Sequence, residues 1–308
     1  MRRRSFFLGC VAGILALVQS WPAPSQDRIQ VITTTTDLRS LTEMVGGDLL
    51  DVSNLVPANF DAEEYQSKPQ DVLRLRNARL VVRVGLDYDL WFDRLLQDAG
   101  GRDIQRGGAG YVDASYGVAA LEVRGVSLGT GDGHAHGSAN PHYWLDPRNA
   151  ELITANIFAA LARIDPGNVK IYEANRQAFL ARLDRKITEW ETRLAPVKGI
   201  TIIAYHNSWP YFARRFRLDF AGFLEIKPGV PPTPSHLAGI IQTMRKRGAH
   251  IVVRESHEPD RDVAFVAQRT GASVVVLAAT VGGLPAARDY FSLFETNVGA
   301  LIDAAGPK

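Results

Sequence analysis

The sequence has almost no cysteine, little net charge and no apolar run long enough to span a membrane comfortably. Cys10 is the only cysteine among 308 residues, and it lies in a segment that we expect to be removed on export. The mature protein then has no disulfide, and any metal site in it must use nitrogen and oxygen ligands. The formal net charge is only +2. Nothing in this charge favours a nucleic-acid partner, which usually requires a concentrated basic face, so none is expected.

The first 25 residues have the order of parts of a secretory signal peptide. Three arginines at positions 2–4 precede the apolar run Ser5–Val18, and the small, proline-rich stretch Pro22–Ser25 follows. A membrane-spanning helix needs about 20 apolar residues, and this run is shorter, so we expect a signal peptide that is cleaved. The paired arginines also fit an export signal of the twin-arginine type. Cleavage before Cys10 would leave almost no apolar segment ahead of it, so no lipid anchor is expected. The protein is predicted to be periplasmic or otherwise extracytoplasmic.

Strand-like and helix-like patterns alternate in both halves of the chain. In the first half we expect strands at 31–35, 52–56 and 80–84, with helices at 38–45 and 69–77. In the second half we expect strands at 200–204, 218–223, 251–253 and 274–277, with helices beginning near 209, 235, 259 and 287. Strands separated by helices of this length predict parallel α/β sheets, and here there are two of them.

A continuous helical pattern separates the two halves. The stretch Asn168–Ala195 contains neither glycine nor proline, and its apolar residues fall on one helical face: Phe179, Leu183, Ile187, Trp190 and Leu194. At 1.5 Å per residue the stretch would be roughly 40 Å long. A coiled-coil arm would also show such a face, but the α/β halves on both sides favour a rigid connecting helix. The predicted division is therefore a signal peptide 1–25, an N-terminal lobe 28–165, a connecting helix 166–196 and a C-terminal lobe 197–308.

Two of the seven histidines stand where a ligand could bind. His142 lies in the segment Asn140–Pro147, in which prolines fix the backbone and aromatic residues can shield a site. His206 directly follows the strand expected at 200–204, and α/β sheets place ligands at the carboxyl ends of parallel strands. One such histidine in each half predicts a shared site between the lobes. Two further histidines, in the glycine-rich stretch 129–138, could catch a metal transiently or belong to a solvated loop.

Several motifs, in order along the mature chain, resemble the periplasmic metal-binding proteins that serve zinc and manganese ABC importers. These are Thr33–Leu38 with Val45–Asp48, Asp61–Asp71, Asn140–Pro147, Tyr205–Phe212, Pro234–Leu237 and Tyr290–Asn297. The resemblance implies two α/β lobes joined by a rigid helix, with the metal in the cleft between them. It also implies that His142 and His206 are metal ligands, that ABC importer membrane subunits are the partners, and that the protein is a monomer.

The sequence departs from the family pattern at two ligand positions. The first ligand loop of the family usually reads Asp-Pro-His, whereas here Glu63 stands where the histidine belongs. An aspartate usually follows the last strand, whereas here alanines follow it. Glu63, with Glu64 as an alternative, and Glu255, which follows the strand at 251–253, are the carboxylates expected to complete the site. His257 is expected to face solvent. Two imidazoles with one or two carboxylates suit zinc, the first choice, and also manganese or iron.

The function expected from this set of features is capture of a divalent metal for an ABC importer, without enzymatic activity. A metal chaperone or sensor not tied to an importer would carry the same residues. A zinc-dependent hydrolase could use two histidines and a carboxylate around an acidified water, but the sequence contains no His-Glu-x-x-His helix. The two departures also leave open a site that has lost its metal and takes another ligand in the same cleft.

Overall fold

The first lobe is built around a four-stranded parallel sheet. The structure is a computed structural model and describes residues 28–122, 139–227 and 229–306; the expected signal peptide and the stretch 129–138 lie outside these residues. The strands are β1 (Ile29–Thr33), β2 (Leu50–Asn54), β3 (Leu80–Arg83) and β4 (Tyr111–Asp113), in the order β2-β1-β3-β4. All neighbouring strands are parallel, as expected for strands joined by helical crossovers.

The second lobe repeats the arrangement. Its strands are β5 (Thr201–Ala204), β6 (Asp219–Phe223), β7 (Ile251–Arg254) and β8 (Ser273–Val276), in the parallel order β6-β5-β7-β8. In both sheets the strand order therefore reverses beside the first strand. Ligands of α/β sheets bind at such a switch point, beyond the carboxyl ends of the strands.

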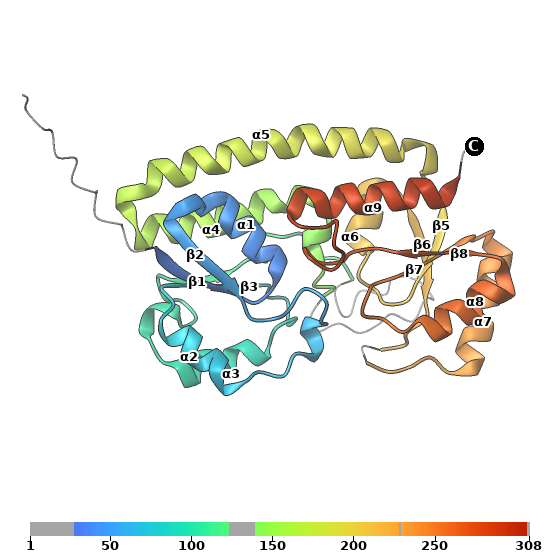
Figure 1. The fold of residues 1–308 in the computed structure, drawn as a ribbon, viewed down its shortest axis with the longest axis horizontal. Coiled ribbons are helices and arrows are strands. Elements are labelled where there is room, and N and C mark those ends of the chain that lie inside the picture. The colour runs from blue at the N-terminus through green and yellow to red at the C-terminus, as the bar shows by residue number, and fades with distance from the viewer. Residues whose placement is uncertain (1–27, 123–138, 228, 307–308) are drawn as a thin grey trace, which may run out of the picture.

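Helices pack around both sheets (Figure 1). Those of the first lobe are α1 (Thr36–Gly46), α2 (Pro69–Arg76), α3 (Trp91–Ala99) and α4 (Ala150–Ile164). Those of the second lobe are α6 (Pro210–Phe216), α7 (Pro234–Arg247), α8 (Asp260–Thr270) and α9 (Tyr290–Ala305). Among the described residues, no helix combines the length and the apolar character needed to cross a membrane.

The long helix α5 (Val169–Leu194) runs along both lobes (Figure 1). Its predicted apolar face is confirmed, because all five residues of that face are buried. Trp190 stacks on Phe294 of α9 with ring centroids 5.0 Å apart, and its indole nitrogen donates to Glu295 at 3.0 Å. The first lobe packs on the same helix through α1 and α4. One continuous apolar core thus spans both lobes.

Direct hydrogen bonds also join the lobes close to the cleft. The backbone amide of Val281 donates to the buried carboxylate of Asp37 at the start of α1, at 2.9 Å. The indole of Trp144 donates to the carbonyl of Ala279 at 2.8 Å, and the hydroxyl of Tyr290 donates to the carbonyl of Trp144 at 2.7 Å. The segment that follows β8 is therefore bound to the first lobe, although it belongs to the second sheet.

The predicted fold class of two parallel α/β lobes with a long helix between them is confirmed. Each predicted strand is present within about two residues of its expected position. The sequence analysis did not identify three elements of the first lobe, namely β4, α3 and α4. The shortest of them, β4, has only three residues, which is too few for a periodic pattern to stand out.

Candidate metal centre

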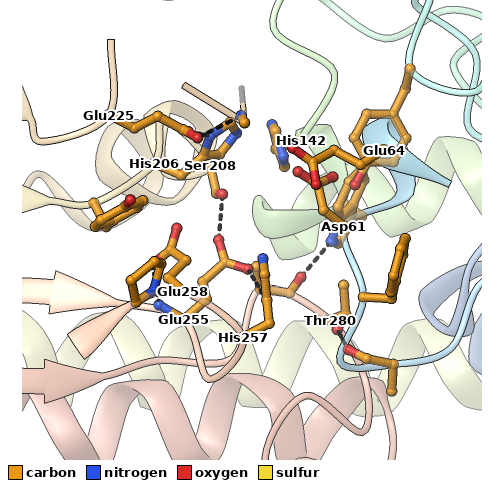
Figure 2. A pocket seen from close by; sticks show the side chains of 18 of the residues that line it. Asp61, Glu64, His142, His206, Ser208, Glu225, Glu255, His257, Glu258 and Thr280 are labelled. Atoms are coloured by element: carbon orange, nitrogen blue, oxygen red, sulfur yellow. Dashed lines mark hydrogen bonds and ion pairs between the residues drawn. The ribbon is translucent and has the colours of Figure 1, made fainter. Parts of the chain in front are cut away.

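A cavity of about 300 Å³ lies between the lobes and is lined by segments of both. Most of these segments follow the carboxyl ends of strands, where a parallel sheet leaves room for a ligand. Three histidines and several acidic residues gather there (Figure 2). The titratable residues of the lining are Asp61, Glu64, Tyr88, His142, Tyr205, His206, Glu225, Glu255, His257 and Glu258.

His142 is held in the cavity wall by its neighbours in the Asn-Pro-His segment. The side-chain oxygen of Asn140 accepts from the backbone amide of His142 at 3.0 Å and lies 3.3 Å from its ring Nδ1. The ring packs between Tyr88 and Trp144, with centroids 5.4 and 5.2 Å away. Only 4% of the residue is exposed. Trp144 belongs to the segment whose aromatic residues were expected to shield the site, whereas Tyr88 comes from the loop after β3.

His206 approaches from the second lobe, directly after β5, with its ring centroid 5.4 Å from that of His142. Its Nδ1 lies 2.5 Å from a carboxylate oxygen of Glu225, and both residues are buried. Burial lowers the pKa of His206. The hydrogen bond to Glu225 and the nearby charges, including those of Glu63 and Glu255, outweigh that effect and raise the pKa to about 10. The surroundings of this ring therefore favour positive charge.

Glu255 follows β7 and is buried against the same cavity. One of its carboxylate oxygens accepts from the hydroxyl of Ser208 at 2.5 Å. Burial raises the pKa of Glu255 to about 7, against the opposing effects of the His206 charge and the Ser208 hydrogen bond. The pKa of the neighbouring Glu258 is raised well above its ordinary value by burial and by the charge of Glu255. A bound cation would stabilise the ionised form of carboxylates that are crowded together in this way.

The first ligand loop presents Asp61 and Glu64 to the cavity, and Glu63 to its neighbourhood. Asp61 caps a single 3-10 turn (Ala62–Glu64) by accepting from the amide of Glu63 at 2.8 Å. Burial, followed by the charge of Glu63, raises the pKa of Asp61 to about 6. Glu63 itself lines an adjoining shallow hollow rather than the cavity, although its charge acts on His206.

The structure thus gathers three of the four predicted ligands, His142, His206 and Glu255, around one cavity, and places Glu63 beside it. His257 also lines the cavity, and its Nδ1 lies 3.8 Å from a carboxylate oxygen of Glu255 (Figure 2). Asp61, Glu225 and Glu258 were not proposed from the sequence. Glu225 and Glu258 follow the ends of β6 and β7 closely, so the same rule that selected His206 could have found them.

The donor set fits a divalent transition metal, since imidazole nitrogen and carboxylate oxygen are ligands of zinc, manganese and iron. Within residues 28–122, 139–227 and 229–306, no three His, Cys, Asp or Glu side chains are already arranged as a metal-binding group. A cation held jointly by both histidines and a carboxylate therefore requires side chains of the cavity to shift.

Comparisons with known proteins agree with this chemistry. The crystal structure of ZnuA is 28% identical and superposes with a TM-score of 0.78 over 91% of this chain and 100% of that one. The iron-binding protein YfeA of Yersinia pestis is 25% identical over 94% of this chain and 91% of its own. The manganese ABC transporter substrate-binding lipoprotein PsaA of Streptococcus anginosus is 23% identical over 96% of both. The family model of the periplasmic zinc-uptake complex component A, ZnuA, matches residues 31–304. The resemblance of the motifs is thereby confirmed, and the chain belongs to the family of the periplasmic component A of zinc-uptake complexes.

Proposed function

We propose that this protein captures a divalent transition-metal ion, with zinc as the first choice and manganese as the second, and delivers it to the membrane subunits of an ABC importer. The observation that carries the proposal is the pair of buried histidines, one from each lobe, whose rings lie 5.4 Å apart in a cavity rich in carboxylates. His142, His206 and Glu255 are the proposed ligands. Either Glu63 or Asp61 of the first loop supplies the remaining carboxylate.

Zinc is preferred because two imidazoles with carboxylates suit a four-coordinate ion. The name of the matching family and of the similar crystal structure also refers to zinc uptake. Manganese is the second candidate because the cavity contains more carboxylates than histidines, and harder ions favour oxygen ligands. The relatives named for manganese and iron support keeping this alternative.

Release to an importer, rather than catalysis, is supported by the kinds of protein to which the chain is similar. A cargo site must give up its ion. A histidine binds a metal only through a deprotonated ring nitrogen, so protons compete with the metal for His142 and His206. A chaperone that passes its ion to another exported protein would share this property, and only the partner distinguishes the two.

Elemental analysis and competition titration of the mature protein test the proposal. The wild type should bind one zinc ion per chain. Structural zinc sites with four ligands are worth about 10–16 kcal/mol, or roughly 3 kcal/mol per ligand. Each of the variants His142→Ala and His206→Ala should therefore weaken binding roughly 100-fold or more. The double variant should bind no metal above background.

His250→Ala is the matched control, because this histidine is exposed and lies outside the cavity. Its zinc affinity should equal that of the wild type. One-to-one binding that survives the double variant would place the metal elsewhere and would overturn the site assignment. A wild type that binds neither zinc nor manganese would overturn the function itself. Co-purification of metal-loaded protein with importer membrane subunits, but not of the double variant, would separate delivery to an importer from a chaperone role.

A further inference from the structure

Glu225 uses both of its carboxylate oxygens inside the cavity wall. One oxygen lies 2.5 Å from Nδ1 of His206, and the other accepts from the backbone amide of Gly229 at 2.7 Å. Only 7% of Glu225 is exposed. The carboxylate is therefore fixed at both ends, one end on the histidine ring and the other on the loop that follows β6. A side chain held in this way has little freedom to turn.

His142 has a similar contact on the same ring nitrogen, but its partner is neutral. The side-chain oxygen of Asn140 lies 3.3 Å from Nδ1 of His142. The amide group of Asn140 is itself anchored, because it donates to the carbonyl of Asn207 at 2.9 Å and to the carboxylate of Glu122 at 3.1 Å. His142 and His206 thus each have Nδ1 engaged by an anchored side-chain oxygen. Metal binding would then use Nε2 of each ring.

Outer hydrogen bonds of this kind fix the tautomer and orientation of a metal-binding histidine, and a carboxylate partner makes the ring a stronger donor than an amide partner does. We propose that Glu225 is a positioning residue that holds His206 with its hydrogen on Nδ1 and with Nε2 directed to the metal, and that its charge makes His206 the stronger of the two imidazole donors. The inference rests on the proposed function, because it names a residue that sets the affinity of the same site.

The geometry favours this role over direct coordination by Glu225. Each of its oxygens already accepts a short hydrogen bond from the protein. Coordination through the oxygen on His206 would have to lengthen a contact of 2.5 Å and release the ring. Glu255 and Asp61, by contrast, face the cavity without contacting a histidine ring nitrogen at hydrogen-bond distance among the described residues.

The test compares zinc affinity in the mature protein and three variants by competition titration. Glu225→Gln gives His206 the amide type of partner that His142 already has, and should weaken zinc binding about 10- to 100-fold. Glu225→Asp keeps the charge but is one methylene shorter, so it cannot span Nδ1 of His206 and the amide of Gly229 together; it should also lose affinity. Glu64→Gln removes one negative charge from an exposed side chain that lines the same cavity, and measures the effect of charge alone.

Two spectroscopic readouts separate positioning from other roles. The zinc-loaded wild type should show nitrogen NMR shifts of His206 that indicate metal on Nε2 and hydrogen on Nδ1. Its Nδ1 proton should move upfield in Glu225→Gln, because the charged acceptor is gone. Cobalt-loaded Glu225→Gln should keep the visible absorption intensity of the wild type, since the set of ligands is unchanged.

Metal on Nδ1 of His206, or a changed cobalt spectrum in Glu225→Gln, would overturn the inference. An affinity loss no larger than that of Glu64→Gln, together with full affinity in Glu225→Asp, would also overturn it, because charge alone would then explain the effect. If the wild type binds no metal, the proposed function fails. In that case the Nδ1 proton of His206 in the metal-free protein still shows whether Glu225 holds the ring: an unshifted signal in Glu225→Gln would refute the contact.

Discussion

Replacing Asp37 by asparagine should stabilise the metal-free protein increasingly as the pH rises from 5 to 8. Asp37 lies in the first turn of α1 and is completely buried. One carboxylate oxygen accepts from Val281 across the lobes, and the other has no hydrogen-bond partner among the described residues. Burial, the largest influence, raises the pKa of this carboxyl from 3.8 to about 7 in the folded protein.

The size of the effect follows from the two pKa values. In the unfolded chain the carboxyl loses its proton near pH 4, whereas in the folded protein it keeps the proton until about pH 7. Wild-type stability therefore falls between these pH values and levels off above the folded pKa. At 1.36 kcal/mol per unit, the full loss is roughly 4 kcal/mol, and the part that falls between pH 5 and 8 is roughly 2.7 kcal/mol.

Asparagine cannot ionise, so this part of the pH dependence should disappear in Asp37→Asn. The side chain still offers an oxygen to Val281, and it buries one unpaired polar group, as the protonated carboxyl does. Free energies of unfolding in urea at pH 5 and pH 8, with a metal chelator present, measure the change. Asp48→Asn is the control, because Asp48 is exposed. A stability difference between Asp37→Asn and the wild type that stays constant within about 0.5 kcal/mol from pH 5 to 8 would refute the reasoning.

Three further predictions concern packing, the cleft and the ligand. Trp190→Ala should cost about 3–5 kcal/mol in urea unfolding, because the ring is buried and stacked on Phe294; a loss below 1 kcal/mol would show that α5 is not held through this contact. Gly229→Ala should lower the free energy of unfolding by about 1 kcal/mol or more, because its φ is +73° and the added Cβ would lie 2.3 Å from a carboxylate oxygen of Glu64. In the Gly229→Ala, Glu64→Ala double variant, only the part of the stability loss that is due to the clash should be restored. Full recovery of the free energy of unfolding would show that the positive φ of residue 229 does not contribute. Free zinc at 100 times its dissociation constant should stabilise the wild type by about 2.7 kcal/mol, and a thermal scan in which the His142→Ala, His206→Ala double variant is stabilised equally would contradict binding in the cleft.

Much of the architecture is determined by local sequence patterns. The apolar face of α5 recurs at helical spacing, so its burial could be predicted without knowing its neighbours. The alternation of strands and helices fixed two parallel sheets, because short strands joined by helical crossovers have few other solutions. His142 and His206 could be selected for the same reason: one lies in a rigid aromatic segment, and the other follows a strand at the edge where parallel sheets bind ligands.

Tertiary structure decided which carboxylates accompany these histidines. Asp61 and Glu63 are two residues apart, and only a single 3-10 turn, capped by Asp61 itself, determines that Asp61 lines the cavity and Glu63 the hollow beside it. Glu225 reaches His206 only because β6 lies next to β5 in the sheet. Asp37 meets Val281 across 244 residues of sequence. The spacing of apolar residues predicts which face of a helix or strand is buried. The contacts of Glu225 with His206 and of Asp37 with Val281 depend instead on how the packing of strands and lobes brings distant loops together.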